Sequence, residues 1–307
     1  QMAESILAWR QKGGNPGPQG AQSSYYQALN PAYAAKNQPF ESIEELNYIA
    51  GMTQEVLYGW DANLNGFNDP GELYSAQHLP PGLFGLVTVW SVDPNVSLAG
   101  KARANINLPN AQQLQQAGLT QAEITALQST LRTSGPFLSI AHLLGGRGVA
   151  PVLTTARFKT LADKLTVNPA ATIPGLVNIN TAPMPVLLAL PGMTQDLASK
   201  IIAQRMAVGA NLSSIGWLTD VLSAPQLQQM ANSITCRSYQ FRINAVGRIG
   251  TPYTANATGD GPVGRPGAMK RMMAVVDLLA SPQPRLVYWK DMTKLGMPYD
   301  PSAGPGP

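Results

Sequence analysis

The stretch Val177–Arg205, VNINTAPMPVLLALPGMTQDLASKIIAQR, predicts two short helices joined by a glycine turn. Thr181 is the expected N-cap of the first helix, which has two prolines in its first turn, where a missing backbone N–H costs little. Pro191-Gly192 ends that helix, and Thr194 caps the next one. This is a helix-hairpin-helix pattern. Such hairpins either bind DNA phosphates at the turn or serve only as packing modules.

Similar turn and cap residues recur along the chain, which indicates internal repeats. The recurring features are a glycine turn followed by a threonine cap, a Pro-Phe pair followed by a serine cap, and an Asn-Ile-Asn triplet. We therefore expect the middle of the chain to be a helical domain of related hairpin units. The segments are Gly51-Met52-Thr53-Gln54, Gly118-Leu119-Thr120-Gln121 and Gly192-Met193-Thr194-Gln195; Pro39-Phe40-Glu41-Ser42-Ile43, Pro136-Phe137-Leu138-Ser139-Ile140 and the weaker echo Asn211-Leu212-Ser213-Ser214-Ile215; and Asn105-Ile106-Asn107 and Asn178-Ile179-Asn180.

The composition excludes several classes of protein. The 307 residues are enough for two or three domains, and 44% of them are apolar but only 12% are charged. The net charge of +4 comes from scattered basic residues, which is weak evidence for a nucleic-acid partner. A single cysteine, Cys236, excludes an intramolecular disulfide framework, and two histidines, His78 and His142, are too few to indicate a histidine-based metal or catalytic site.

Helix and strand patterns place a small body around the helical repeats. Ala3–Gln11 enters in helical register without a cap, so we expect the helix, with any signal or anchor, to begin upstream of this chain. Ser42 and Glu45 have the spacing of a capping box for a later helix. β-branched residues predict a first strand at Leu86–Val92. Further strands are expected at Tyr239–Ile249 and Met269–Leu278, with apolar content from Ala245, Val246, Val275 and Val276, and at Arg285–Lys290.

The expected fold class is therefore α+β: an N-terminal helix packed on a small antiparallel sheet, with a large inserted helical domain of hairpin units. The expected divisions are 1–38, the end of the N-terminal helix and a loop of the body; 39–235, a mainly helical insertion with a calcium-type loop at 61–72; 236–297, the C-terminal strands that complete the body; and 298–307, a Pro/Gly/Ser tail expected to be disordered.

Residues 61–72, DANLNGFNDPGE, fit a calcium-loop pattern with oxygen-bearing side chains at alternate positions and glycine at the sharp bend. A tightly wound loop of this spacing brings the oxygens onto one hard cation. The affinity should be modest because two ligand positions are neutral Asn. The alternative is a polar loop of Asn/Asp turns, which Pro70 and the lack of a long helix after the loop favour. The ligands would be Asp61, Asn63, Asn65, the Phe67 carbonyl, Asp69 and Glu72.

Other chemistry is less well supported by the sequence. DNA binding at the 192–196 turn would need exposed backbone N–H groups and nearby basic residues, yet Asp196 places a carboxylate there and the closest basic residues are Lys200 and Arg205. Packing is therefore the default role of the hairpins. Serine, histidine and aspartate form no arrangement typical of a nucleophile elbow or triad, so we expect no catalytic residues. His142 and Cys236 are expected to be packing residues.

Taken in order, several segments resemble the minor pseudopilin K family of bacterial type II secretion systems (general secretion pathway protein K). The resemblance covers most of the chain, and its motifs become specific only through their order. The segments are Ala3-Glu4-Ser5-Ile6-Leu7-Ala8-Trp9, Tyr25-Tyr26, Pro39-Phe40-Glu41-Ser42-Ile43-Glu44-Glu45-Leu46 with Gly51-Met52-Thr53, Val87-Thr88-Val89-Trp90-Ser91, Asn178-Ile179-Asn180-Thr181-Ala182-Pro183 and Leu190-Pro191-Gly192-Met193.

The resemblance implies a pilin-like body with a large helical insertion, on the periplasmic side of the inner membrane of a Gram-negative-type bacterium, anchored by an N-terminal helix absent from this chain. It implies a structural, non-enzymatic role that joins the minor pseudopilins I and J at the tip of the pseudopilus filament, with no nucleic-acid partner. Calcium (Ca²⁺) binding is known in the family and agrees with the 61–72 loop without fixing its ligands. The alternative is a DNA-binding protein, because Asn178–Pro183 is also similar to the helix-hairpin-helix of competence-type DNA receptors.

Overall fold

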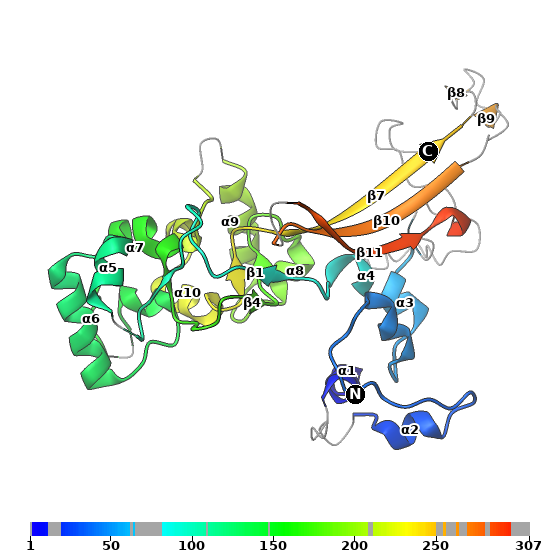
Figure 1. The fold of residues 1–307 in the computed structure, drawn as a ribbon, viewed down its shortest axis with the longest axis horizontal. Coiled ribbons are helices and arrows are strands. Elements are labelled where there is room, and N and C mark those ends of the chain that lie inside the picture. Colours follow the sequence, from blue (N-terminus) through cyan, green and yellow to red (C-terminus); the bar gives the residue numbers. More distant parts are fainter. Residues whose placement is uncertain are drawn as a thin grey trace. The chain divides into compact units, whose positions relative to one another are not determined.

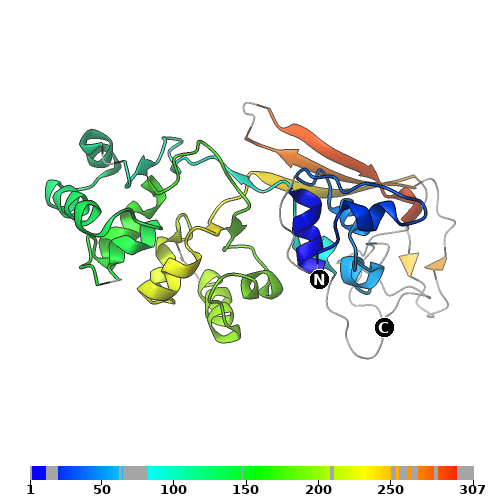
Figure 2. The ribbon, with the colours of Figure 1, turned by 90° about the horizontal axis from the view of Figure 1, so that it is seen from below.

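The computed structural model describes residues 2–11, 20–61, 64, 82–108, 110–146, 148–207, 211–249, 254–255, 262–263, 269–279 and 283–295. The chain divides into two compact units, which we describe separately (Figures 1 and 2). The first unit comprises Gln1–Val89, Arg242–Asp277 and Pro284–Pro307. The second unit comprises Trp90–Phe241 and Leu278–Gln283.

Short helices form the N-terminal part of the first unit, and their caps follow the sequence signals. Ser42 and Glu45 form the expected capping box, with Glu45 Oε1 accepting the Ser42 N–H at 3.2 Å. Thr53 caps the next helix by accepting the Val56 N–H at 3.2 Å. Both caps satisfy backbone donors that a helix leaves unpaired at its start. The helices are α1 (Met2–Arg10), α2 (Ser23–Gln27), η1 (Ile43–Tyr48), α3 (Gln54–Tyr58) and α4 (Leu83–Leu86); the short helix η5 (Thr293–Leu295) follows near the C-terminus.

An aromatic cluster holds α1 against the segment that follows it. The Trp9 ring is 5% exposed, makes an edge contact with Tyr26 at 5.2 Å between ring centres, and stacks on Tyr48 at 6.5 Å. Tyr33 packs among the same rings and donates a hydrogen bond to the Tyr48 carbonyl at 3.0 Å. Such ring pairs add stability beyond their buried area, so this cluster fixes the position of α1 within the unit.

Three long strands form the sheet of the first unit: β7 (Gln240–Arg248), β10 (Met269–Asp277) and β11 (Arg285–Asp291) (Figure 1). Their order is β11-β10-β7, and β10 pairs antiparallel with β11. These elements confirm the three C-terminal strands that the sequence predicts. A further short pair, β8 (Thr254–Ala255) with β9 (Pro262–Val263), is also antiparallel.

Burial within the sheet differs from the expectation at one strand. Met273 and Val275 of β10 are 4% and 2% exposed, whereas Val276 is half-buried on the other face. Val246 of β7 is 36% exposed and Ala245 is also exposed, so the apolar content expected from these two residues does not lie on a buried face. The reason is that period-2 alternation identifies two faces of a strand but does not say whether either face is covered.

The second unit contains two successive segments, here called the two copies, with a similar order of strands and helices. In each copy the first strand pairs in parallel with the last, β2 with β3 and β5 with β6. An additional antiparallel pair joins β1 (Val92–Asp93) to β4 (Ile173–Pro174). The first copy contains β2 (Ala104–Asn105), α5 (Ala111–Ala117), α6 (Gln121–Ser134), η2 (Ile140–Leu144), α7 (Thr155–Leu161), η3 (Ala162–Lys164) and β3 (Leu165–Thr166); the second contains β5 (Val177–Asn178), α8 (Met184–Leu188), α9 (Gln195–Arg205), η4 (Ile215–Asp220), α10 (Ala224–Met230) and β6 (Ile234–Thr235).

The Asn-Ile-Asn triplets make equivalent contacts in both copies. The central isoleucine, Ile106 or Ile179, is fully buried, and its N–H donates to the closing strand at 2.9 Å. The last asparagine then ties two distant segments together through its amide: Asn107 bonds both backbone groups of Phe137 at 2.8 Å, and Asn180 donates to the Leu212 carbonyl at 2.9 Å. The repeated sequence therefore encodes a repeated hydrogen-bond pattern, not only a repeated helix count.

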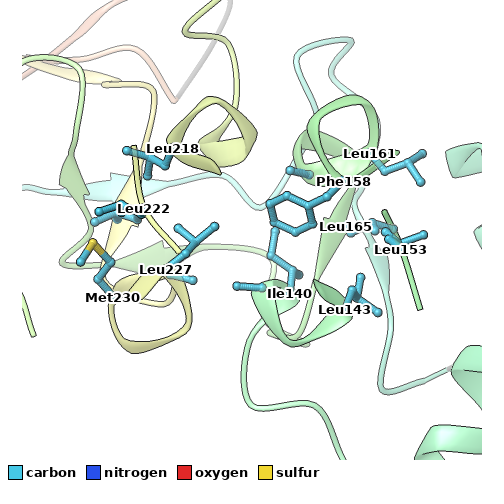
Figure 3. Packing of buried hydrophobic residues seen from close by; sticks show 14 of the residues in the cluster. Ile140, Leu143, Leu153, Phe158, Leu161, Leu165, Leu218, Leu222, Leu227 and Met230 are labelled. Atoms are coloured by element: carbon cyan, nitrogen blue, oxygen red, sulfur yellow. The ribbon is translucent and has the colours of Figure 1, made fainter. Parts of the chain in front are cut away.

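The two copies share one hydrophobic core because each packs on the other reciprocally. The η2 helix of the first copy packs against α10 of the second, and α7 of the first packs against η4 of the second. Figure 3 shows the side chains of the two copies facing one another across this seam, with Phe158 and Ile140 on one side and Leu222 and Leu227 on the other. Burial of these side chains is the main stabilising term for the unit.

Three expectations about local structure are wrong. Leu86–Val92 is not a strand: Leu86 ends α4, and only Val92 and Asp93 pair, with β4. Here the β-branched run lies across the boundary between the two units, and strand propensity does not supply a pairing partner. Thr181 does not cap α8, whose N-cap is Pro183 with Pro185 inside the first turn. The compact helical unit begins at Trp90 rather than at 39, because η1 and α3 belong to the first unit.

Candidate functional site

The turn between α8 and α9 is the place where a helix-hairpin-helix could bind phosphate. Gly192 adopts φ +71° in this turn, a conformation that favours glycine, and Thr194 caps α9 by accepting the Leu197 N–H at 3.3 Å. A Cβ built on Gly192 would lie 1.9 Å from Oε1 of Gln229, which belongs to α10. The side chain of Gln229 therefore covers the glycine turn.

The basic residues near this turn are already engaged. Lys200 forms an ion pair with Asp196 at 2.7 Å, one helical turn earlier on α9. Arg205 donates hydrogen bonds to the carbonyls of Ile179 at 3.0 Å and Ala182 at 2.8 Å. Phosphate binding needs free N–H groups and free cations at the turn, so this arrangement does not support the DNA-binding alternative.

The equivalent turn of the first copy, between α5 and α6, is closed in the same manner. Gly118 ends α5 at φ +104°, and Thr120 and Glu123 form a capping box at the start of α6. Arg157 of α7 reaches across and donates to Glu123 Oε1, Glu123 Oε2 and the Gly118 carbonyl, each at 2.8 Å. Hydrogen bonds from Arg157 lower the pKa of Glu123 to about 2.

Both hairpin turns are thus packing sites. In each copy the turn is covered by a later helix of that copy, by Arg157 of α7 in one and by Gln229 of α10 in the other. The covering side chains occupy the backbone groups or the space that a ligand would use. This geometry fixes the angle between α5 and α6 in one copy and between α8 and α9 in the other.

The calcium-type loop lies almost wholly outside the described residues. Of the six expected ligands only Asp61 is described, and Asn63, Asn65, Phe67, Asp69 and Glu72 are not. Arg271 of β10 is 2% exposed and donates to the carbonyl of Leu64. Burial lowers the pKa of the Arg271 guanidinium, and the negative charge of Asp61 partly offsets this effect. The beginning of the loop is therefore joined to the sheet. Among the residues that the structure describes, no three His, Cys, Asp or Glu side chains gather as metal ligands.

A buried polar network at the seam of the two copies was not predicted from the sequence. Asp93 of β1 is 2% exposed, accepts from the Thr235 hydroxyl at 2.7 Å and pairs with Arg103 at 3.4 Å. Asp163 pairs with Arg237 at 3.2 Å. Burial lowers the pKa of the Arg103 guanidinium, and the nearby carboxylates partly offset this effect. These residues are scattered along the sequence, so spacing alone carries no signal of their contact.

A cavity of about 420 Å³ adjoins this network and includes Arg103, Arg237 and Cys236 in its wall. The Cys236 thiol is the free cysteine of the chain, and burial raises its pKa to about 12, so it stays protonated and unreactive at neutral pH. His142 lies in η2, where its Nδ1 is 3.0 Å from the Ser139 hydroxyl at the start of that helix. Both residues have the packing surroundings that the sequence predicts.

Comparison with known families identifies the chain. One family model, described as type II secretion system (T2SS) protein K, matches residues 1–59, and a second model with the same description matches residues 177–236. The chain belongs to the protein K family of type II secretion systems. No curated protein sequence matches the chain.

Membership in the protein K family gives the chain a role in type II secretion, as an envelope-associated structural component that works with other proteins of the system. The first matched segment carries α1 and its aromatic cluster, and the second spans the whole of the second repeat, from β5 to β6. Among the helices that the structure describes, none has the length and apolar character needed to cross a membrane.

Proposed function

We propose that this protein K is the minor pseudopilin at the tip of the type II secretion pseudopilus, where it assembles with the I- and J-type minor pseudopilins to support export across the outer membrane. It is the periplasmic part of a protein anchored in the inner membrane by an N-terminal helix that precedes α1. Its sheet and α1 form a pilin-like body, and the duplicated helical unit provides bulk at the tip. The hairpin pairs α5–α6 and α8–α9 act in it as helix-hairpin-helix packing modules.

The single observation that best supports this scaffold role is the closure of both hairpin turns by side chains of their own copy. Arg157 and Gln229 occupy the positions where a nucleic-acid ligand would approach. A protein with this arrangement contributes shape and contact surface rather than chemistry at the turns. Membership in the protein K family indicates that this contact surface is used within the type II secretion system.

In this proposal α1 contributes the assembly surface of the body. One side of α1 is buried, with Ser5 fully enclosed and Trp9 in the aromatic cluster, whereas Leu7 is 47% exposed. An exposed leucine on a helix otherwise fixed in place suits packing against a helix of a neighbouring subunit. Calcium bound by the 61–72 loop would stiffen this part of the first unit.

The test is co-purification of this chain with the I and J homologues from the same genome. We expect a stable complex by size-exclusion chromatography, and Leu7→Lys should reduce its recovery at least several-fold because the lysine would bury a charge at the contact. Leu98→Lys is the matched control: Leu98 is 66% exposed on the second unit and should leave recovery unchanged. Absence of a complex with the wild-type chain would refute the proposal, and salt-sensitive micromolar binding of duplex DNA would favour the competence-type alternative.

A further inference from the structure

A second cavity in the helical unit is lined by basic residues that are only partly paired with carboxylates. It has a volume of about 430 Å³ and lies between the 97–104 segment, α5 and the end of η3. Three basic residues line it and none of its lining residues is acidic; its floor is made of alanines. The lining residues are Ser97, Ala99, Lys101, Ala102, Arg103, Ala104, Gln113, Gln116, Ala117 and Lys164.

The cations of this cavity are not neutralised equally. Arg103 faces Asp93 and Asp163 on its inner side, at 3.4 Å and 3.9 Å, so its charge is largely balanced within the protein. Within the described part of the chain, neither Lys101 nor Lys164 has a carboxylate within ion-pair distance. The cavity therefore carries an excess of about two positive charges inside a unit whose other surface lysines, such as Lys159 and Lys200, pair with aspartates.

The backbone of Lys101 is fixed before any ligand arrives, and the ammonium of Lys164 lies beside the end of α5. The Lys101 backbone is fixed in a tight turn, in which its carbonyl accepts from the Ser97 N–H at 2.7 Å and its N–H donates to the Ser97 hydroxyl at 3.3 Å. The Lys164 ammonium lies 3.9 Å from a Cβ built on Gly118, at the C-terminal end of α5. The turn fixes the Lys101 backbone, while the exposed side chains of Lys101 and Lys164 lose rotamer freedom when they bind an anion.

We propose that this cavity binds a carboxylate carried on a short aliphatic chain. Lys101 and Lys164 would supply the charge, Gln113 and Gln116 would donate amide hydrogen bonds, and the alanine floor would contact the methylene groups. An acidic side chain of a polypeptide and a free dicarboxylate both present this chemistry. A nucleic-acid backbone fits less well, because the basic residues of the chain are scattered and do not form a continuous stripe.

The inference does not depend on the assembly proposed above, and calorimetric titration of the isolated 307-residue chain tests it. Two probes distinguish the source of the carboxylate: glutarate, and a capped pentapeptide of sequence Glu-Glu-Ala-Glu-Glu. We expect saturable binding of at least one of them at low salt, weakened by added salt because the contacts are ionic. Binding of the peptide alone identifies an acidic polypeptide segment, and binding of glutarate identifies a free dicarboxylate as a ligand.

The decisive variant is Lys101→Gln with Lys164→Gln, which should weaken binding about tenfold or more because it removes two charge-assisted hydrogen bonds. Lys200→Gln with Lys294→Gln is the control, since it makes the same change in net charge at two exposed positions outside the cavity and should leave affinity unchanged. A melting curve checks that both variants are folded. The proposal fails if neither probe binds, if both double variants lose affinity equally, or if sulfate or duplex DNA binds as well as the carboxylates.

Discussion

Gly216 provides the sharpest test of the reciprocal packing between the two repeats. It lies in η4 of the second copy, and a Cβ built on it would be 2.7 Å from Cα of Lys159 and 3.1 Å from its carbonyl oxygen, in α7 of the first copy. Non-bonded carbon atoms prefer about 3.5–4.0 Å, so Gly216→Ala would push the two helices apart by roughly 1 Å. Both contacts are to backbone atoms, which side-chain rotation cannot relieve.

The cost follows from what α7 carries at this contact. Phe158 is fully buried and Leu161 is 2% exposed, and a gap of about 1 Å removes a quarter to a half of the dispersion energy of each facing atom pair. Overpacking of a well-packed core costs about 1–3 kcal/mol, so we expect Gly216→Ala to lower the unfolding free energy of the helical unit by about 2 kcal/mol. For a unit of this size the melting temperature should fall by about 4–8 °C.

The assay is urea unfolding followed by far-UV circular dichroism, supported by calorimetry and fitted with a separate transition for each unit. Gly85→Ala is the matched control: it adds the same methyl group in α4, where nothing lies within 4 Å, and alanine favours a helix by about 0.5–1 kcal/mol over glycine. We expect this control to leave the transition of the helical unit unchanged. If Gly216→Ala changes that transition by less than about 0.5 kcal/mol, the close approach of α7 to η4 is wrong.

Three further predictions concern single contacts. Arg157 lowers the pKa of Glu123 from 4.5 to about 2, so the pair contributes stability that is fully present above pH 4.5 and is lost as the pH falls towards 2. Glu123→Gln should therefore lower the free energy of unfolding by about 1–2 kcal/mol at neutral pH. In urea unfolding at several pH values, the same variant should show a weaker dependence of stability on acid pH. Glu44 of η1 accepts from the Tyr288 hydroxyl at 2.8 Å and from Lys290 at 3.0 Å, so Glu44→Gln should destabilise the first unit by about 1–3 kcal/mol in the same assay. Calcium at about tenfold its dissociation constant should stabilise the wild-type chain by about 1.4 kcal/mol in thermal unfolding, and Asp61→Ala with Glu72→Ala should abolish this effect.

Each of these experiments has a control and an outcome that contradicts it. Glu55→Gln changes an exposed carboxylate of α3 and should leave both unfolding transitions unaltered. An acid dependence of the same slope in Glu123→Gln and wild type would show that the Arg157 contact is absent in solution. If Glu44→Gln and Glu55→Gln have the same free energy of unfolding, the contact between η1 and β11 does not stabilise the first unit. An identical melting temperature of the wild-type chain with calcium and with chelator would show that calcium does not stabilise the chain.

The pKa values around Glu44 give that contact an internal check. Burial alone would raise the pKa of Glu44, but hydrogen bonds from Lys290 and Tyr288 hold it below 4.5. Burial and the adjacent carboxylate both raise the pKa of the Tyr288 phenol above its ordinary value of 10.0. Glu44 therefore stays ionised and Tyr288 stays protonated across the neutral range, and η1 should stay attached to β11 there.

Local signals in the sequence were reliable where the physical cause is itself local. A threonine or serine followed three residues later by a glutamate marks a helix start because the two side chains satisfy nearby N–H groups, and both Ser42 and Thr120 form such boxes. Gly118 and Gly192 end or bend helices because both take positive φ. Local reasoning failed at Leu86–Val92, because a strand requires a partner and propensity does not provide one.

The repeated motifs of the sequence determined that the middle of the chain contains related helical units, and the ordered family motifs determined the family to which it belongs. Only the tertiary structure decided how the two copies are used. It places η2 against α10 and α7 against η4, covers the hairpin turns with Arg157 and Gln229, and gathers Asp93, Asp163 and Arg103 at one seam. These contacts join residues far apart in the chain, and their energy depends on burial and distance, which spacing along a sequence does not encode.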